Sequence, residues 1–188
     1  MTQHALYQWP HPLALYPDRG KKSYRMKRLR YRLRSLLHRQ TIKKFECFVN
    51  QNASLVPLMN TRPDFSYPLA HRFLDKRFSA KQRLDAMCDN LTFLPEKLTA
   101  LGLPPLWQHA ISFGEVIPDF ELKLMLSEHQ PMEGFWTLEL IHSPSQELVY
   151  LLTFGKVQQA LLIAVIQGPN FEGSKDMVKL LTKKCHGL

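Results

Sequence analysis

The stretch that decides the fold is residues 134–167, GFWTLELIHSPSQELVYLLTFGKVQQALLIAVIQ. Trp136, Leu138 and Leu140 alternate with Thr137 and Glu139, which predicts a strand over 134–141, and residues 147–154 predict a second one. Short loops join these strands to each other and to a third strand over 158–167. Successive strands with short loops pair in antiparallel order, so the stretch predicts a three-stranded meander. The third strand is apolar on both faces, and we expect it near the sheet centre under helices.

Segments on both sides of the meander complete this half of the chain. Residues 109–116 and 121–127 alternate more loosely and predict two earlier strands. After Gly173 the apolar residues recur at helical spacing. This spacing predicts a short carboxyl-terminal helix that lies against the last strand.

The first half of the chain predicts helices. Residues 20–51 have the period of one long amphipathic helix, and we expect its apolar face to be buried. The residues of this face are Met26, Leu29, Leu33, Leu36 and Leu37. Shorter helices are predicted over 68–77, 80–93 and 96–101, because proline or serine stands at their starts. Residues 52–67 predict a connector, and residues 1–19 an irregular arm.

These elements predict an α+β fold, in which amino-terminal helices pack on a mostly antiparallel sheet and a carboxyl-terminal helix follows. A sheet like that of the GNAT-type acetyltransferases fits the same order of elements. After the arm, we expect a single domain over 20–188 of the 188 residues. Its helical half covers 20–106 and its sheet half covers 107–188.

Positive charge is concentrated near the amino terminus. Residues 19–44 hold 12 of the 25 lysines and arginines and none of the 16 acids, so the rest of the chain has 13 bases against those acids. On a helical wheel, one narrow arc collects residues that we call the basic ridge: Lys21, Arg25, Arg28, Arg32, Arg39 and Lys43. The ridge fits an anionic membrane surface or an acidic protein face. A solvated face on a packed helix explains the same charges.

Composition indicates a reduced, cytoplasmic protein. The three cysteines are far apart, and no Cys/His spacing of a metal site occurs, so we predict no metal. The first 20 residues lack the basic and apolar regions of a secretory signal. The longest uncharged apolar run, residues 160–166, is too short to cross a bilayer, which takes about 20 residues.

The segment after the last strand resembles a phosphate-binding loop. Gly168 and Gly173 are followed by Ser174 and Lys175, whereas the nucleotide triphosphatase loop needs lysine first and then serine or threonine. A second hypothesis is a coenzyme site, in which Gln167 and these residues bind the pyrophosphate of acyl-coenzyme A at the helix start. The glycine spacing of GNAT enzymes is absent, because Asn170 stands in place of the first glycine. A tight turn with helix caps explains the same residues.

Several pieces of the sequence resemble the VirK/YbjX family of Gram-negative bacteria, which is defined by DUF535. The resemblance rests on Met132-Glu133-Gly134 before a strand, on Gln167-Gly168-Pro169 after one, and on Thr182-Lys183 followed by His186-Gly187-Leu188. The residues that match are Glu133, Gly134, Gln167, Gly168, Thr182 and His186. Backbone freedom at turns explains the two glycines. Family members typically continue past the His-Gly-Leu element, so we expect this chain to correspond to the amino-terminal part of a longer protein.

The resemblance implies a virulence- or stress-associated accessory protein without an established reaction or cofactor. Such proteins are linked to the display of surface proteins and to resistance against antimicrobial peptides. We expect a non-enzymatic protein that is peripheral at the cytoplasmic face of the inner membrane. Two alternatives are an acyl-coenzyme A-dependent N-acyltransferase and a nucleic-acid-binding protein that uses Arg25, Arg28, Arg30 and Arg32. The oligomeric state stays open.

Overall fold

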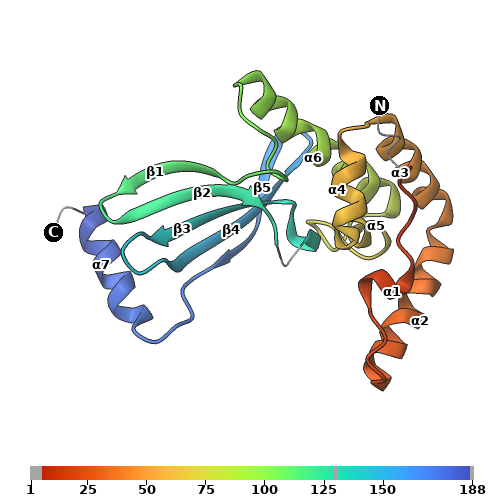
Figure 1. Cartoon of the computed structure of the whole chain (residues 1–188), viewed down its shortest axis with the longest axis horizontal. Helices are drawn as coiled ribbons and strands as arrows, with labels where there is room; N and C mark the ends of the chain where they lie inside the picture. Colours follow the sequence, from red (N-terminus) through yellow and green to blue (C-terminus); the bar gives the residue numbers. More distant parts are fainter. Residues whose placement is uncertain (1–5, 129–130, 187–188) are drawn as a thin grey trace. The chain divides into compact units, whose positions relative to one another are not determined.

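The computed structural model describes residues 6–128 and 131–186, and their contacts divide the chain into two compact units. The first unit is Met1–Phe93 and the second is Leu94–Leu188, so the boundary lies inside a helix, α6 (Ala80–Ala100). Helices come first, a five-stranded sheet follows and a helix ends the described chain, which confirms the α+β class (Figure 1). The single domain over 20–188 stays a prediction.

The first unit is helical and short connections join its elements. They are α1 (Pro12–Leu15), α2 (Lys22–Leu37), α3 (Arg39–Gln51), α4 (Leu55–Thr61), a 3-10 turn η1 (Pro63–Ser66), α5 (Tyr67–Ala70) and the first part of α6. Aromatic side chains such as Tyr31, Phe45 and Phe65 form its core and are fully buried. Burial of these large rings supplies much of the stabilisation that a unit of this size needs.

The helices differ from the sequence prediction in several places, and of the helix predicted over 68–77 only the part in α5 is helical, because the chain leaves helical geometry at His71. The long helix over 20–51 is broken at His38, which leaves helical geometry and separates α2 from α3. The predicted connector is mostly helical, because Leu55, Leu58 and Met59 bury themselves in the core and packing overrides the turn formers. The two short helices on either side of Pro95 are one, since α6 continues through this proline.

The amino-terminal arm is tied to the helices of its unit by side-chain hydrogen bonds. The Tyr7 N–H donates to Asn50 Oδ1 at 2.8 Å, and Asn50 Nδ2 donates back to the Tyr7 carbonyl at 3.0 Å. The Tyr31 hydroxyl donates to the Pro10 carbonyl at 2.8 Å. The Trp9 ring stacks on Tyr31 with centroids 6.1 Å apart. These contacts fix which side of α2 faces the core.

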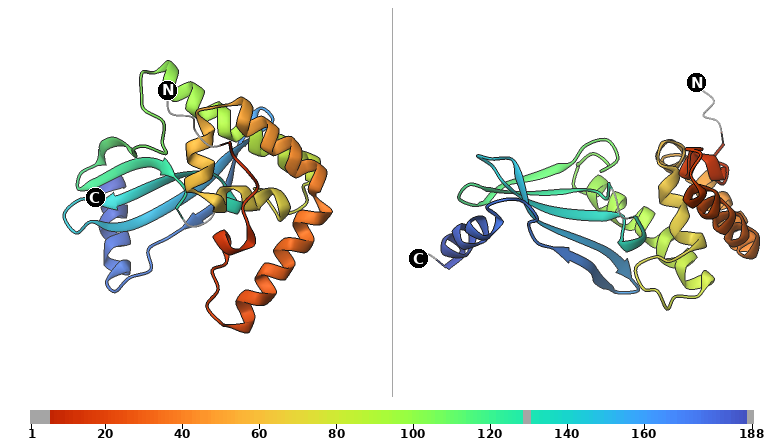
Figure 2. Two further views of the ribbon diagram at one scale, coloured as in Figure 1. Left: turned by 45° about the vertical axis from the view of Figure 1, so that its right-hand side comes forward. Right: turned by 90° about the horizontal axis from the view of Figure 1, so that it is seen from below.

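The second unit contains a sheet with the order β1-β2-β3-β4-β5, and every neighbouring pair is antiparallel. The strands are β1 (Ile111–Ile117), β2 (Phe120–Leu126), β3 (Trp136–His142), β4 (Glu147–Val157) and β5 (Ala160–Gln167). The meander and the two earlier strands are therefore confirmed, each with small shifts at its ends. The views from other sides show the twist of this sheet (Figure 2).

The position of β5 differs from the prediction, because it is an edge strand and not a central one. Leu161, Leu162, Ile163 and Ile166 are between 37% and 64% exposed. The prediction was wrong because it took the apolar composition as a sign of neighbours on both sides. Among the described residues, no strand pairs with the outer side of β5.

The last helix, α7 (Ser174–His186), covers part of one sheet face near the turn between β1 and β2 (Figures 1 and 2). Its Leu181 is buried with Phe120 of β2 and Val149 of β4. The Lys184 ammonium donates to the Pro118 carbonyl at 3.1 Å and pairs with the Asp119 carboxylate. The helix therefore packs on the face of the sheet, where the sequence predicted a position against the last strand.

Candidate functional site

The helix α2 presents its apolar side to solvent, and this is the most unusual surface of the first unit. Five residues form what we call the apolar row: Met26, Leu29, Leu33, Leu36 and Leu37. They are between 42% and 78% exposed, although the amphipathic pattern predicted that they would be buried. Single exposed leucines are common, whereas a contiguous row on one helix points to an interaction surface.

Contacts on the opposite side of α2 explain why the apolar row is exposed to solvent. There Tyr31 is buried, and the Trp9 indole N–H donates to Ser35 Oγ at 3.0 Å. The Arg34 guanidinium donates to the Tyr67 hydroxyl on the same side. The hydrogen bonds of this side orient the helix, because a half-buried polar group without its partner is costly. A helix cannot bury both sides against one neighbour, so the leucines remain exposed.

Cations border the apolar row. Within the basic ridge, Lys21, Arg25, Arg32, Arg39 and Lys43 are exposed. Arg28 differs from these five residues, because its side chain already has partners within the chain. It is half-buried, its guanidinium lies 3.4 Å from the Asp18 carboxylate, and it donates to the Tyr16 carbonyl at 3.3 Å. The break at His38 places Arg39 and Lys43 on α3, so the ridge predicted on one helix is divided between two. The exposed Arg30 lies beyond the other side of the row.

The aromatic rings near the start of α2 already have cationic neighbours within the chain. The Lys27 ammonium lies 5.4 Å from the centre of the Tyr24 ring, and the Arg19 guanidinium lies at the same distance. The Lys27 ammonium is also 5.9 Å from the centre of the Tyr16 ring. These cation–π contacts hold basic side chains close to α2. They strengthen the positive potential at the end of the helix that precedes the apolar row.

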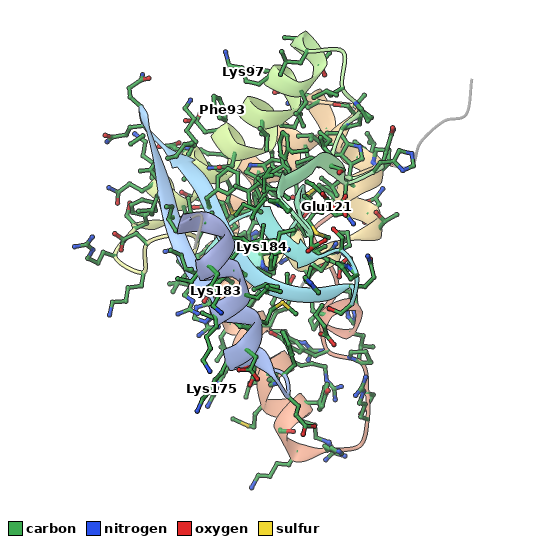
Figure 3. The ribbon with its side chains drawn as sticks, turned by 90° about the vertical axis from the view of Figure 1, so that its left-hand side faces the viewer. Phe93, Lys97, Glu121, Lys175, Lys183 and Lys184 are labelled. Carbon is green, nitrogen blue, oxygen red and sulfur yellow. The ribbon has the colours of Figure 1, made fainter. Side chains whose placement is uncertain are left out.

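The hydrogen bonds described at the end of the segment from Gln167 to Lys175 are those of a turn that leads into a helix. The Ser174 N–H donates to the Phe171 carbonyl at 3.1 Å, and the Met177 N–H donates to the Gly173 carbonyl at 3.2 Å. Asp176 lies in the first turn of α7, where its charge opposes an incoming anion. Lys175 is exposed near the start of α7, and Lys183 and Lys184 lie near its end (Figure 3). Gly173 has a φ of +82°, which fits a turn before a helix.

No gap opens between β4 and β5 beside Gln167. The two strands stay paired from Val157 and Ala160 to Leu151 and Gln167, with one irregularity between Thr153 and Phe154. A coenzyme pocket of the GNAT type needs the strands to separate, so the paired ladder gives the coenzyme hypothesis no support. Coenzyme binding by Gln167 and the residues after it stays a prediction.

A hollow of about 240 Å³, which no sequence pattern predicted, lies on the sheet of the second unit. Its lining includes Thr137, Glu139, Leu151, Thr153 and Gln167. The Thr153 hydroxyl is buried and has no hydrogen-bond partner among the described residues. The hollow has room for a few water molecules, which would satisfy such a group. Only the register of three strands brings these residues together, which is why no local pattern predicts the hollow.

The residues that matched the family lie in turns or loops, at the end of β5 and in a helix, and most of their described contacts are with the backbone. Gly134 has a φ of +136°, and a Cβ atom there would lie 2.4 Å from the Phe154 carbonyl oxygen. Gly168 has an ordinary φ, so backbone freedom does not explain it. Thr182 Oγ1 donates to the Val178 carbonyl at 2.8 Å within α7. Glu133 lies in the turn η2 (Pro131–Glu133), and the His186 side chain is outside the described part.

Two features that the described residues lack bear on the kind of site. No group of three His, Cys, Asp or Glu side chains within 6–128 and 131–186 is placed to hold a metal ion. None of the helices described has both the length and the apolar character that a bilayer crossing requires. Cys47, Cys88 and Cys185 are free thiols.

Comparison with known proteins shows relatives over almost the whole chain. A Mannheimia haemolytica protein named "Membrane protein LapB" is 68% identical over 183 residues, which are 97% of this chain and 80% of that protein. Two uncharacterized proteins of Haemophilus influenzae are 61% and 30% identical over 188 and 185 residues. The chain spans 64% and 63% of these two relatives. No solved structure matches the chain.

The family model described as "Protein of unknown function (DUF535)" matches residues 20–188. This match covers the basic ridge, the apolar row, the sheet and α7. It confirms the resemblance to VirK/YbjX proteins that the sequence motifs indicated. The chain belongs to the DUF535 family.

Proposed function

We propose that this protein is a non-enzymatic accessory protein of the VirK type that lies on the cytoplasmic face of the inner membrane. The observation that carries the proposal is the exposed apolar row of α2 with cations on both of its sides. A helix of this kind lies in the membrane interface, with its apolar side among the acyl chains and its cations at anionic headgroups. The name of the M. haemolytica relative, "Membrane protein LapB", supports an association with a membrane.

The magnitudes show which part of α2 contributes most to such binding. A leucine that leaves water completely contributes roughly 1.5–3 kcal/mol, and a basic residue near an anionic membrane about 1 kcal/mol. The four leucines of the row therefore outweigh a similar number of arginines. Arginines attract the protein from a distance, and leucines hold it at the surface. In this role the protein would assist the display of surface proteins or the resistance to antimicrobial peptides.

The leucines also separate the membrane hypothesis from the nucleic-acid alternative. Nucleic acid is bound through phosphates, and its affinity comes mainly from lysine and arginine. Arg25, Arg30 and Arg32 could serve both ligands, but the apolar row serves only a lipid surface or another apolar partner. The acyl-coenzyme A alternative rests on the order of elements alone, and calorimetry with acetyl-coenzyme A tests it directly.

Vesicle flotation tests the proposal with the whole chain. We expect binding to vesicles with phosphatidylglycerol, weaker binding to neutral phosphatidylcholine vesicles, and little binding after Leu33→Gln, Leu36→Gln and Leu37→Gln together. These side chains are exposed, so the triple variant keeps the fold. A matched control is Leu6→Gln, Leu13→Gln and Leu101→Gln, which changes three exposed leucines elsewhere. The proposal fails if the wild-type protein binds neither kind of vesicle at low salt, or if both triple variants lose binding equally.

A further inference from the structure

Four basic side chains gather in the first unit, where the ends of three helices meet. Arg34 lies in the last turn of α2 and His38 directly after it, His71 follows α5, and Arg83 lies in the first turn of α6. Arg83 Nη2 lies 3.4 Å from His38 Nε2. The Tyr67 hydroxyl accepts from the Arg34 guanidinium, and the Tyr67 ring centre lies 5.5 Å from that of His71. We call Arg34, His38, His71 and Arg83 the basic cluster.

Arg83 is the deepest member of the basic cluster, and its hydrogen-bond partners carry no charge. Its side chain belongs to a residue that is only 7% exposed. The guanidinium donates from Nε to the Leu69 carbonyl at 3.0 Å and from Nη1 to the Phe78 carbonyl at 2.8 Å. Carbonyl groups satisfy N–H donors but do not neutralise the charge, and a buried charge without an opposite charge is costly. Burial accordingly lowers the pKa of this guanidinium.

No carboxylate of the described residues pairs with a member of the basic cluster. Burial lowers the pKa of both histidines, Arg34 and Arg83 lower it further in each, and Arg72 adds to the effect on His71. The charges of the cluster therefore act on one another. Three other arginines of this unit do have an acidic partner, in the pairs Arg28–Asp18, Arg62–Asp64 and Arg77–Asp75. The missing acid is thus a particular property of the basic cluster.

We propose that the basic cluster binds a phosphate group, which is either a soluble phosphate or the phosphomonoester headgroup of a lipid. Its two guanidinium groups carry two permanent positive charges, which match the charge of about −1.5 to −2 on a phosphomonoester near pH 7. A carboxylate would neutralise only one of them. Arginine forks donate well to phosphate oxygens, and imidazole N–H groups supply further donors. Arg34, His38 and His71 are half-buried, so an anion reaches them from solvent, while Arg83 adds its charge from below.

Calorimetry with sodium phosphate at constant ionic strength tests the site in the whole chain. We expect one phosphate per chain, and binding about tenfold weaker or more after Arg34→Gln, which removes one of the two permanent charges. Glutamine can still donate to the Tyr67 hydroxyl, so this variant keeps the fold. The matched control is Arg32→Gln, which removes an exposed cation of the same helix and should leave the affinity unchanged. A wild type that binds no phosphate, or equal losses in the two variants, overturns the proposal.

Sulfate tests the histidines separately, because it keeps two charges between mildly alkaline and mildly acidic pH. Its affinity should rise as the pH falls through this range, since a bound anion favours the protonated histidines against the surrounding arginines. The variant with His38→Gln and His71→Gln should lose this rise. An equal rise in this variant would place the anion away from the histidines and contradict the proposal.

Short-chain lipids separate the two sources of the phosphate group. Dihexanoyl phosphatidic acid should compete with inorganic phosphate for the site, and dihexanoyl phosphatidylcholine should not. A phosphatidic acid affinity well above that of inorganic phosphate identifies a lipid headgroup, and equal affinities identify a soluble phosphate. Equal competition by phosphatidylcholine would show binding of acyl chains and overturn the proposal. The Leu33→Gln, Leu36→Gln and Leu37→Gln variant should bind phosphate like the wild type, so flotation and this test fail independently.

Discussion

Gly134 and Gly168 both match the family motifs, but only at Gly134 does the structure exclude a side chain. At Gly134 a Cβ atom would lie 2.4 Å from the Phe154 carbonyl oxygen, and φ is +136°. At Gly168 a Cβ atom would only touch the Tyr150 ring, at 3.5 Å. The constraint on Gly134 comes from β4, far along the chain, so the local sequence could not distinguish the two positions.

The substitution Gly134→Ala should therefore lower the free energy of unfolding by about 3 kcal/mol, because it combines backbone strain with a clash against fixed backbone. Gly168→Ala should change it by less than about 0.5 kcal/mol, as is usual for surface positions without special geometry. Denaturant unfolding of both variants beside the wild type measures the difference. Equal effects of the two substitutions would show that the close approach to Phe154 does not determine the choice of glycine.

At the scale of elements, the strands were predictable because their period of two is local. The positions of all five strands agree with the sequence to within a few residues, as the meander over 134–167 shows. The helices were less predictable, since packing breaks the helix at His38 and carries α6 through Pro95. The position of β5 was wrong, because composition does not tell whether a neighbouring strand exists. The exposure of α2 was missed for a similar reason, as an amphipathic pattern is the same for a buried and a membrane-facing helix.

The break between α2 and α3 contains a titratable group whose protonation the fold opposes. Burial lowers the pKa of His38, and Arg83 and Arg34 lower it further. Arg83 Nη2 lies 3.4 Å from His38 Nε2. Burial also lowers the pKa of His71, with Arg34 and Arg72 adding to the effect. Each folded histidine therefore binds a proton less readily than in the unfolded chain.

Stability should consequently be constant above the ordinary histidine pKa of about 6.5 and decrease as the pH falls below it. The decrease ends once the pH is below the lowered pKa of the folded state, because both states are then protonated. His38→Gln should reduce the decrease, and His38→Gln with His71→Gln should reduce it further. Urea unfolding between neutral and mildly acidic pH measures this effect. An unchanged slope in the double variant would assign the pH dependence to other groups.

For the molecule as a whole, charge is divided unequally along the chain. The net charge is +9, but residues 19–44 hold 12 of the 25 bases and the remaining chain has more acids than bases. This division could be taken from the sequence alone, as could the family. Only the structure shows that the five apolar residues of α2 are exposed beside these charges. This part of the candidate site could not be predicted from the sequence. An anionic membrane would attract this segment and repel the rest of the chain.

The two contributions to membrane binding should respond differently to salt. Attraction to the headgroups is screened, since the Debye length falls from about 10 Å at 0.1 M salt to about 3 Å at 1 M. Insertion of the apolar row is not screened. The wild type should therefore keep part of its vesicle binding at high salt, and so should a variant with Arg25→Gln, Arg30→Gln and Arg32→Gln. The Leu33→Gln, Leu36→Gln and Leu37→Gln variant should dissociate completely. If salt removes the wild type as fully as it removes the leucine variant, binding is electrostatic alone and the apolar row has another partner.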